Sequence, residues 1–179
     1  MSQFSANHSQ EHLDKAMYIC KYLAGTSRYA LVYNGHSQRG LLAYTDSDWA
    51  AHKATRQSVT GHFLRIANGI FSWQSQAHKT VAQSSTKADY MALSHCSQQA
   101  VWLKTMLAEL GVPIKAVPIY GDDQGSIFNA SNPVQEKRMK HIDIQYRFVR
   151  ECVEDGKVEL FFVEGINNPA NLFIKSWTY

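Results

Sequence analysis

Residues 41–50 carry the sequence LLAYTDSDWA, in which a short apolar run leads directly into two aspartates. The run predicts a buried strand, and Asp46 and Asp48 follow it at the period-two spacing that places side chains on one face of a strand. A carboxylate at the end of a core strand is costly unless something pairs with it. Two interpretations stay open here: a strand-to-turn junction in which Asp and Ser bond nearby backbone amides, or a site that gathers carboxylates.

The whole chain has the composition of one globular domain. Of its 179 residues, 45% are hydrophobic and 18% charged, and the formal net charge of +3 is compatible with a polyanionic partner. Cys20, Cys96 and Cys152 show no metal-ligand spacing, so we interpret them as reduced thiols of an intracellular protein, cytoplasmic or nuclear. No apolar stretch approaches the roughly 20 residues of a membrane helix, and the polar N-terminus has no signal-peptide pattern. We therefore expect a soluble protein without a membrane partner.

Hydrophobic periodicity predicts an antiparallel first half, followed by alternating strands and helices. An N-terminal helix from His12 to Gly25 is followed by a strand over Tyr29–Tyr33. Two further strands, at 61–66 and 70–75, enclose an Asn-Gly hairpin signal. A long helix is expected over 86–110, with a break allowed near 94–97. The later elements are strands at 117–120 and 158–163, helices at 126–130 and 142–153, and a short final helix after Pro169. This order is typical of a mixed α/β sandwich.

Acidic residues stand at predicted strand ends or helix starts in three separated places. These are Asp46 with Asp48, Asp89 in the first turns of the long helix, and Asp122 with Asp123. Carboxylates gathered from distant segments suit a divalent-metal site for phosphoryl transfer, because Mg²⁺ prefers oxygen ligands. The alternative is that each aspartate only caps a helix or turn, which is its commonest use in such positions.

Ordered motifs along the chain resemble the ribonuclease H domain of copia-type retrotransposon polyproteins. They include YTDSDWA, KTVAQSSTKADYMALS, GDDQGSI, KHIDIQYRFVRE and NPANLFIK. Residues 1–35, a helix and a strand, resemble the end of the adjoining reverse transcriptase, and residues 36–179 resemble the ribonuclease H domain itself. The resemblance implies an α/β, ribonuclease-H-like fold with a mixed sheet of about five strands flanked by helices. It also implies an endonuclease that hydrolyses the RNA strand of RNA/DNA hybrids, carried in a larger polyprotein.

The same resemblance implies a set of site residues. Asp46, Asp89 and Asp122 are the expected metal ligands for Mg²⁺ or Mn²⁺, with two ions in an active enzyme, and Asn171 occupies the fourth catalytic position. The family has glutamate at the position of Asp89, which shortens the reach by roughly 1.3 to 1.5 Å where the tolerance is about 0.2 Å. It has aspartate at the position of Asn171, so one negative charge is lost. We expect hydrolysis to be slowed by roughly three to four decades.

Contacts with a nucleic-acid backbone are expected from polar and basic residues in two stretches, namely Ser85, Lys137, Arg138, Lys140 and His141. The basic stretch is equally compatible with a solvated face, the serine with helix capping, and the histidine with positioning of the next helix. We interpret Trp49, Trp73 and Trp102 as core residues rather than base-stacking platforms.

Two other functions compete with an impaired nuclease. One is a catalytically inactive remnant that still binds nucleic acid, which the altered ligand positions favour. The other is a domesticated interaction module, in which the fold serves protein contacts and the acidic site is incidental.

Overall fold

The chain divides into two compact units, Met1–Val32 and Tyr33–Tyr179. The computed structural model describes residues 5–35, 40–51, 55–78, 82, 84–131 and 143–175. The first unit consists of helix α1 (Gln10–Gly25) and the extended residues after it, and it confirms the expected N-terminal helix. No residue of α1 is buried, and apolar side chains such as Met17 and Leu23 are exposed. The assignment of residues 1–35 to the polymerase side stays a prediction.

The strand predicted over Tyr29–Tyr33 is wrong. These residues form no strand, and Tyr29 and Val32 are 82% and 73% exposed. Tyr33 is the first residue of the second unit, and within that unit its hydroxyl donates to the Ile70 carbonyl over 2.7 Å. The apolar pattern resembles a strand, but among the described residues no sheet edge pairs with its backbone.

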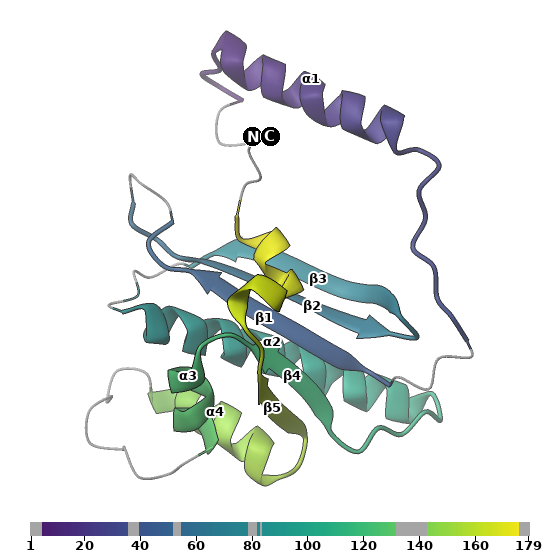
Figure 1. The fold of residues 1–179 in the computed structure, drawn as a ribbon, viewed down its shortest axis with the longest axis vertical. Helices are drawn as coiled ribbons and strands as arrows, with labels where there is room; N and C mark the ends of the chain where they lie inside the picture. The colour runs from purple at the N-terminus through teal and green to yellow at the C-terminus, as the bar shows by residue number, and fades with distance from the viewer. Residues whose placement is uncertain are drawn as a thin grey trace. The chain divides into compact units, whose positions relative to one another are not determined.

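The second unit is built on a five-stranded mixed sheet of order β3-β2-β1-β4-β5 (Figure 1). Its strands are β1 (Leu42–Asp48), β2 (Val59–Ile66), β3 (Gly69–Ala77), β4 (Val117–Gly121) and β5 (Val158–Phe162). The β1–β2 and β2–β3 pairs are antiparallel, whereas β1–β4 and β4–β5 are parallel. The predicted fold class and the antiparallel start of the sheet are therefore confirmed.

The hairpin between β2 and β3 is also as predicted. Ala67 and Asn68 have φ of 50° and 66°. Positive φ at both central residues is the turn geometry whose twist matches that of the flanking strands, and asparagine tolerates it well. The two turn residues join Ile66 to Gly69, which pair at this end of the β2–β3 hairpin.

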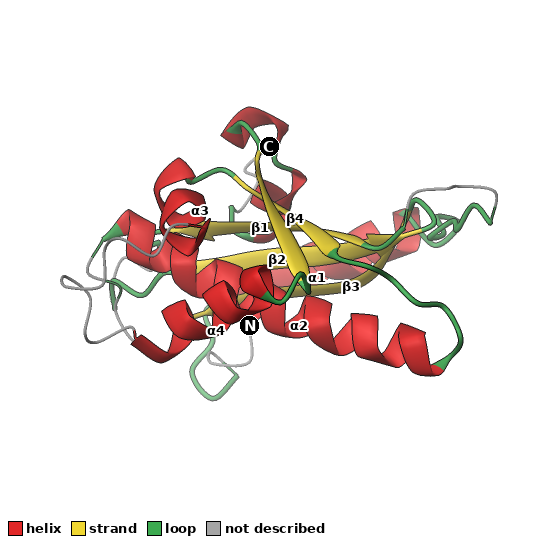
Figure 2. Cartoon of the chain, turned by 90° about the horizontal axis from the view of Figure 1, so that it is seen from below, coloured by secondary structure: helices red, strands yellow, loops and turns green. Residues whose placement is uncertain are grey.

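Helices α2 (Ser85–Glu109) and α4 (Asp143–Glu154) lie along one face of the sheet (Figure 2). Helix α3 (Gln124–Ser131) follows β4, and the 3₁₀ helices η3 (Gly165–Asn167) and η4 (Pro169–Phe173) follow β5. The break allowed in the long helix is wrong, because α2 is continuous and buries Ser94 and Ser97 within it. Their small side chains let the helix approach the sheet closely. Within the described residues, no helix combines the length and apolar character of a membrane span.

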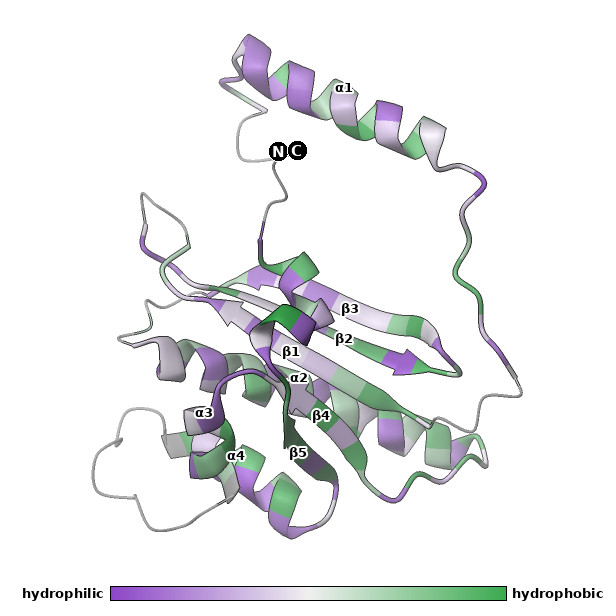
Figure 3. Cartoon of the chain, viewed as in Figure 1, coloured by the Kyte–Doolittle hydropathy of each residue, from purple (hydrophilic) through white to green (hydrophobic). Residues whose placement is uncertain are grey.

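The core lies between the sheet and these helices. Figure 3 shows the hydrophobic colouring of β4 and β5, which line it together with β1 and α2. Its buried members include Ala43, Leu64, Ile119, Leu103 and Val158.

The three tryptophans do not belong to this core, contrary to the prediction. Trp49, Trp73 and Trp102 are 47%, 58% and 56% exposed. Their apolar rings carry no local signal of which face they occupy, and Trp49 keeps its indole N–H satisfied by the Ala82 carbonyl at 3.0 Å.

Candidate functional site

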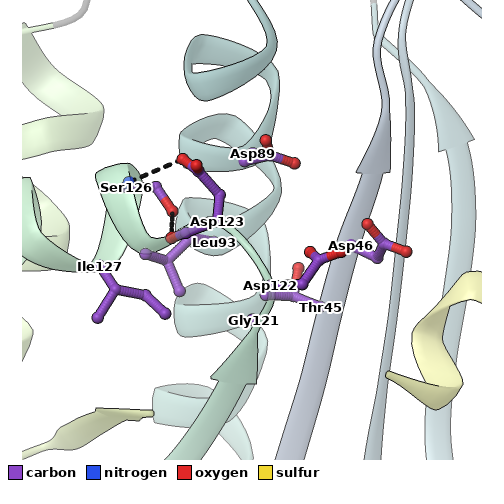
Figure 4. A pocket seen from close by; sticks show the side chains of 9 residues that line it. All are labelled: Thr45, Asp46, Asp89, Leu93, Gly121, Asp122, Asp123, Ser126 and Ile127. Carbon is purple, nitrogen blue, oxygen red and sulfur yellow. Dashed lines mark hydrogen bonds between the residues drawn. The ribbon is translucent and has the colours of Figure 1, made fainter. Parts of the chain in front are cut away.

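Three aspartates from separate elements converge at one end of the sheet. Asp46 lies in β1, Asp122 follows β4, and Asp89 lies in the second turn of α2. Because β1 and β4 are parallel neighbours, their residues at this end stand side by side. One carboxylate oxygen from each aspartate lies within 4.8 Å of those of the other two. Figure 4 shows the three side chains facing the same space.

The carboxylate of Asp46 is the most buried of the three. The residue is 5% exposed, and its Oδ1 accepts from the Ser47 amide over 2.8 Å. Its Oδ2 is buried without a hydrogen-bond partner among the described residues. Burial, and then the charge of Asp122, raise the pKa of Asp46 to about 7. A buried carboxylate oxygen with no partner marks a place where a cation would be favourable.

Asp89 is oriented towards this space by Ser47, the residue of β1 that follows Asp46. The Ser47 hydroxyl donates to its Oδ1 over 2.6 Å, which joins the strand to the start of α2. Burial is the main cause that raises the pKa of Asp89 to about 7, and the charges of Asp123 and Asp122 add to it while the Ser47 bond opposes it. The site thus concentrates negative charge in a partly dry environment.

These residues fit a small divalent cation. Oxygen ligands of one Mg²⁺ lie about 2.9 to 4.2 Å from one another, given bond lengths of 2.0 to 2.1 Å and octahedral geometry. The oxygens of the three aspartates lie within 4.8 Å of one another, so small side-chain rotations would bring them to these ligand distances. The cavity that they line encloses about 10 Å³, which is room for about one water-sized particle.

Of the neighbouring acidic residues, Asp123 lines the same cavity, but its carboxylate is engaged by the start of α3. Asp123 accepts from the amides of Ser126 at 2.8 Å and Gly125 at 3.4 Å, so it caps α3, as the capping interpretation expected. Asp48 is not among the residues that line the cavity. The period-two pair in 41–50 thus contributes one carboxylate to the cluster.

Asn171 is not in the cavity lining either. Its Nδ2 donates to the carbonyls of Gly165 at 2.6 Å and Asn168 at 3.2 Å. Its Oδ1 accepts from Lys175 Nζ over 2.6 Å. Both ends of this amide are therefore occupied by the chain itself, and its catalytic role stays a prediction.

Two residues at the site were missed by the sequence analysis. Ser47 lies between Asp46 and Asp48, and strand alternation could have placed it on the opposite face, towards α2. Lys175 follows η4 in the chain. Burial and the charge of Asp122 raise the pKa of Asp46, and the positive charge of Lys175 lowers it by a smaller amount. No sequence spacing connects these positions.

The expected nucleic-acid contacts are only partly within the described residues. Ser85 is exposed at the start of α2, and the preceding Ser84 caps the helix by accepting from the Lys87 amide over 3.2 Å. The N-cap is thus Ser84 and not Ser85, and a nucleic-acid role of Ser85 stays a prediction. The other four candidates, Lys137, Arg138, Lys140 and His141, lie outside the described residues.

Comparison with solved structures shows which fold the second unit has. Ribonuclease H1 of Halobacterium salinarum NRC-1 superposes with a TM-score of 0.51 at 15% identity, covering 75% of this chain and 94% of that one. A structure described as LC11-RNase H1 in complex with RNA/DNA hybrid gives a TM-score of 0.54 at 14% identity, over 75% and 93% of the two chains. The fold is therefore ribonuclease-H-like, as expected.

Comparison of sequences then shows the family. The chain is 36% identical over 175 residues to the retrovirus-related Pol polyprotein from transposon TNT 1-94 of Nicotiana tabacum, and 34% identical over 176 residues to that from transposon RE1 of Arabidopsis thaliana. Each match covers 98% of this chain but only 13% and 12% of those polyproteins. No family model matches. Along nearly its whole length the chain is therefore similar to one part of the retrotransposon Pol polyproteins, and its fold is ribonuclease-H-like, which confirms the resemblance.

Proposed function

We propose that this domain hydrolyses the RNA strand of RNA/DNA hybrids with the help of divalent cations held by Asp46, Asp89 and Asp122, at a reduced rate. The observation that carries the proposal is the convergence of these three carboxylates within 4.8 Å, together with the buried Asp46 Oδ2, which has no hydrogen-bond partner among the described residues. The hybrid bound in a neighbouring ribonuclease H1 structure supports this class of substrate.

Each residue of the acidic site has its own role in cation binding. Asp46 and Asp122, on adjacent parallel strands, hold the cation from the sheet, and Asp89 closes the ligand set from α2. Ser47 fixes the orientation of Asp89 through its 2.6 Å hydrogen bond. A bound Mg²⁺ or Mn²⁺ neutralises charge at the scissile phosphate and lowers the pKa of water. A bound cation would offset the mutual repulsion of the three carboxylates, so cation binding is coupled to the ionisation of all three.

The reduced rate follows from the ligand set. Asp89 has one methylene less than the glutamate found in the family at that position, and α2 fixes where its backbone starts. The Asn171 amide is neutral and hydrogen-bonded at both ends, so it adds neither charge nor a free oxygen. Losses of about 2 to 3 kcal/mol at each position correspond to roughly three to four decades together.

The second candidate is an inactive domain that still binds hybrid. The commitment of Asn171 to Lys175 and to two backbone carbonyls favours it, because that side chain would need to give up these bonds to reach a cation. In this case the carboxylates would remain without supporting turnover.

Cleavage of an end-labelled RNA/DNA hybrid tests the two candidates. The wild-type domain is assayed with Mg²⁺ and then Mn²⁺, beside Asp46→Asn from the same preparation. We expect slow cleavage that Asp46→Asn abolishes, and a gain of tenfold or more in the Asp89→Glu/Asn171→Asp variant. Salt-sensitive hybrid binding without cleavage in either metal would favour the inactive domain. Equal cleavage by wild type and Asp46→Asn would indicate a contaminating nuclease and reject the proposal.

A further inference from the structure

Thr45, the residue of β1 directly before Asp46, lines the same small cavity as the aspartates (Figure 4). The residue is 4% exposed, and its hydroxyl oxygen Oγ1 is buried without a hydrogen-bond partner among the described residues. Leaving a buried hydroxyl unpaired costs free energy, so such a group indicates a partner from solution, either a water molecule or an ion.

The protein groups around Thr45 do not supply this partner. Thr45 pairs with His62 in the β1–β2 register, but His62 Nδ1 is itself buried without a partner among the described residues. The carbonyl of Thr45 accepts from Asn168 Nδ2 over 3.0 Å, which leaves the hydroxyl unsatisfied. The hydroxyl therefore remains available to a group inside the cavity.

The fold directs the Thr45 side chain towards α2. Side chains alternate along a strand, so Thr45 and Ser47 point to the same face of β1. The Ser47 hydroxyl bonds to Asp89 in α2, and Leu93, one turn further along that helix, lines the cavity together with Thr45. Thr45 thus faces the same helix as Ser47, one turn further from the start of that helix.

The position of this hydroxyl is fixed by its surroundings. Strand β1 pairs with β2 on one side and with β4 on the other, so its backbone is held from both sides. At the end of β4, a Cβ atom on Gly121 would lie 3.7 Å from Thr45 Cγ2. Threonine is β-branched and has few rotamers, so its hydroxyl can hold a ligand with little loss of side-chain freedom.

The cavity has room for one water molecule. It encloses about 10 Å³, which suits one water with about two to four polar partners. The Thr45 hydroxyl and the three converging carboxylates can supply these partners. Asp123 lines the cavity as well, but its carboxylate accepts from the amides of Ser126 and Gly125. Three carboxylates leave part of the octahedral coordination of Mg²⁺ to water, which this ion gives up reluctantly.

We propose that the Thr45 hydroxyl holds a water ligand of the cation in this cavity. The inference rests on the proposed function in one respect, that the aspartates bind a divalent cation. Thr45 is accordingly a positioning residue, which acts on the cation through one fixed water. Such a water favours Mg²⁺, whose octahedral geometry is strict, over Ca²⁺, whose coordination is flexible.

Titration calorimetry of the whole chain with Mn²⁺, Mg²⁺ and Ca²⁺, in the absence of nucleic acid, tests this role. Thr45→Val keeps the branched shape and removes the hydroxyl, so we expect Mn²⁺ and Mg²⁺ to bind about tenfold more weakly. The affinity for Ca²⁺ should change by less than about threefold, because that ion tolerates an altered ligand set. Thr45→Ser retains a hydroxyl and should stay within about threefold of wild type.

Thr60→Val is the matched control. Thr60 is buried in the neighbouring strand β2, its hydroxyl contacts His78 Nε2, and it does not line the cavity. This variant should leave all three dissociation constants unchanged. A crystal structure of wild type with Mn²⁺ should show one water between the ion and Thr45 Oγ1.

The outcomes separate this inference from the proposed function. An unchanged Mn²⁺ affinity in Thr45→Val, an equal loss in Thr60→Val, equal losses for Mg²⁺ and Ca²⁺, or a Thr45 hydroxyl that contacts the ion directly would each overturn it. The crystal structure decides alone if circular dichroism shows Thr45→Val to be unfolded. Absence of Mn²⁺ binding by wild type would reject the cation site as well. Mn²⁺ bound through this water without any hybrid cleavage would reject the nuclease and leave the role of Thr45 standing.

Discussion

Ser47 and Asp89 lie 42 positions apart in the sequence and are joined by a 2.6 Å hydrogen bond from the serine hydroxyl to the aspartate Oδ1. The bond connects β1 to the first turns of α2, and Ser47 stands directly beside Asp46 in the strand. One strand thus supplies a carboxylate on its own and orients a second one from the helix. The geometry of the acidic site depends on this contact between the two elements.

Ser47→Ala should weaken cation binding roughly tenfold. The variant removes a hydrogen bond to a charged group, which is worth about 1.5 to 3 kcal/mol, and leaves Asp89 free to rotate away. It also removes the bond that opposes the raised pKa of Asp89, so protons compete better with the cation. Mn²⁺ titration and hybrid cleavage measure the effect, with Ser72→Ala on β3 as the matched control. Equal affinity and cleavage in Ser47→Ala and wild type would contradict this role.

Asp46→Asn should stabilise the cation-free protein at alkaline pH while removing cation binding. Burial first, and then Asp122, raise the pKa of Asp46 from 3.8 to about 7. The folded state therefore binds this proton more tightly than the unfolded state, and the free energy of unfolding falls as pH rises from 3.8 to about 7. The variant escapes this penalty, and we expect a gain of about 1 to 2 kcal/mol at pH 8 and a smaller one at pH 5.

Urea unfolding at both pH values, with and without Mg²⁺, checks this expectation. Wild type should gain stability from Mg²⁺ at pH 8 and Asp46→Asn should not, because binding to the folded state alone shifts the unfolding equilibrium. Asp155→Asn, at an exposed surface pair, serves as the control variant. A loss of stability in Asp46→Asn that is the same at pH 5 and pH 8 would show that its charge is not the cause.

A buried histidine cluster should make the second unit acid-sensitive. His62 and His78 are buried, and their pKa values are lowered by burial and then by the charge of His95, that of His62 to about 4. His78 Nε2 contacts the Thr60 hydroxyl. A lowered histidine pKa means that the unfolded state takes up the proton first. Stability from His62 is therefore complete above pH 6.5 and is lost as pH falls towards 4.

His62→Gln should flatten this part of the stability profile. The free energy of unfolding, followed by urea denaturation between pH 6.5 and 4, should fall less steeply in the variant, by up to about 1.4 kcal/mol per pH unit for one proton. His8→Gln changes an exposed histidine of the first unit and is the control. An unchanged slope in His62→Gln would mean that the ring is not protonated on unfolding in this range.

Local patterns were sufficient for the sheet and for the acidic residues. The apolar run before Asp46, the Asn68 turn and the apolar stripe of the long helix each record a structure formed by neighbours in the sequence, and each element is confirmed to within a few residues. The three aspartates could be proposed to converge because strand ends and helix starts meet at one edge of such a sheet. The resemblance to retrotransposon polyproteins supplied which aspartates to select.

Contacts between distant segments were not predictable in this way. The prediction of a strand over Tyr29–Tyr33 is wrong because a strand needs a pairing partner, and a local pattern does not show whether one is present. Trp73 is exposed because no described element covers its side of β3. The Ser47 bond to Asp89 and the placement of Lys175 depend on how η4 and α2 dock on β1. Such relationships require coordinates, since side-chain reach and not spacing decides them.

Gly61→Ala should displace η4 from the sheet and lower stability by about 1 to 3 kcal/mol. Gly61 is paired with Asp46 in the β1–β2 register, and a Cβ atom on it would lie 2.7 Å from Ile174 Cγ2 and 2.8 Å from Phe173 Cβ. Because η4 precedes Lys175, cation binding should change as well. Gly121→Ala is the matched control, since its nearest contact would be an ordinary 3.7 Å. Urea unfolding compares the two variants, and Mn²⁺ titration compares Gly61→Ala with wild type, because Gly121 itself lines the acidic cavity. Equal stabilities of the two variants would show that η4 can shift without cost.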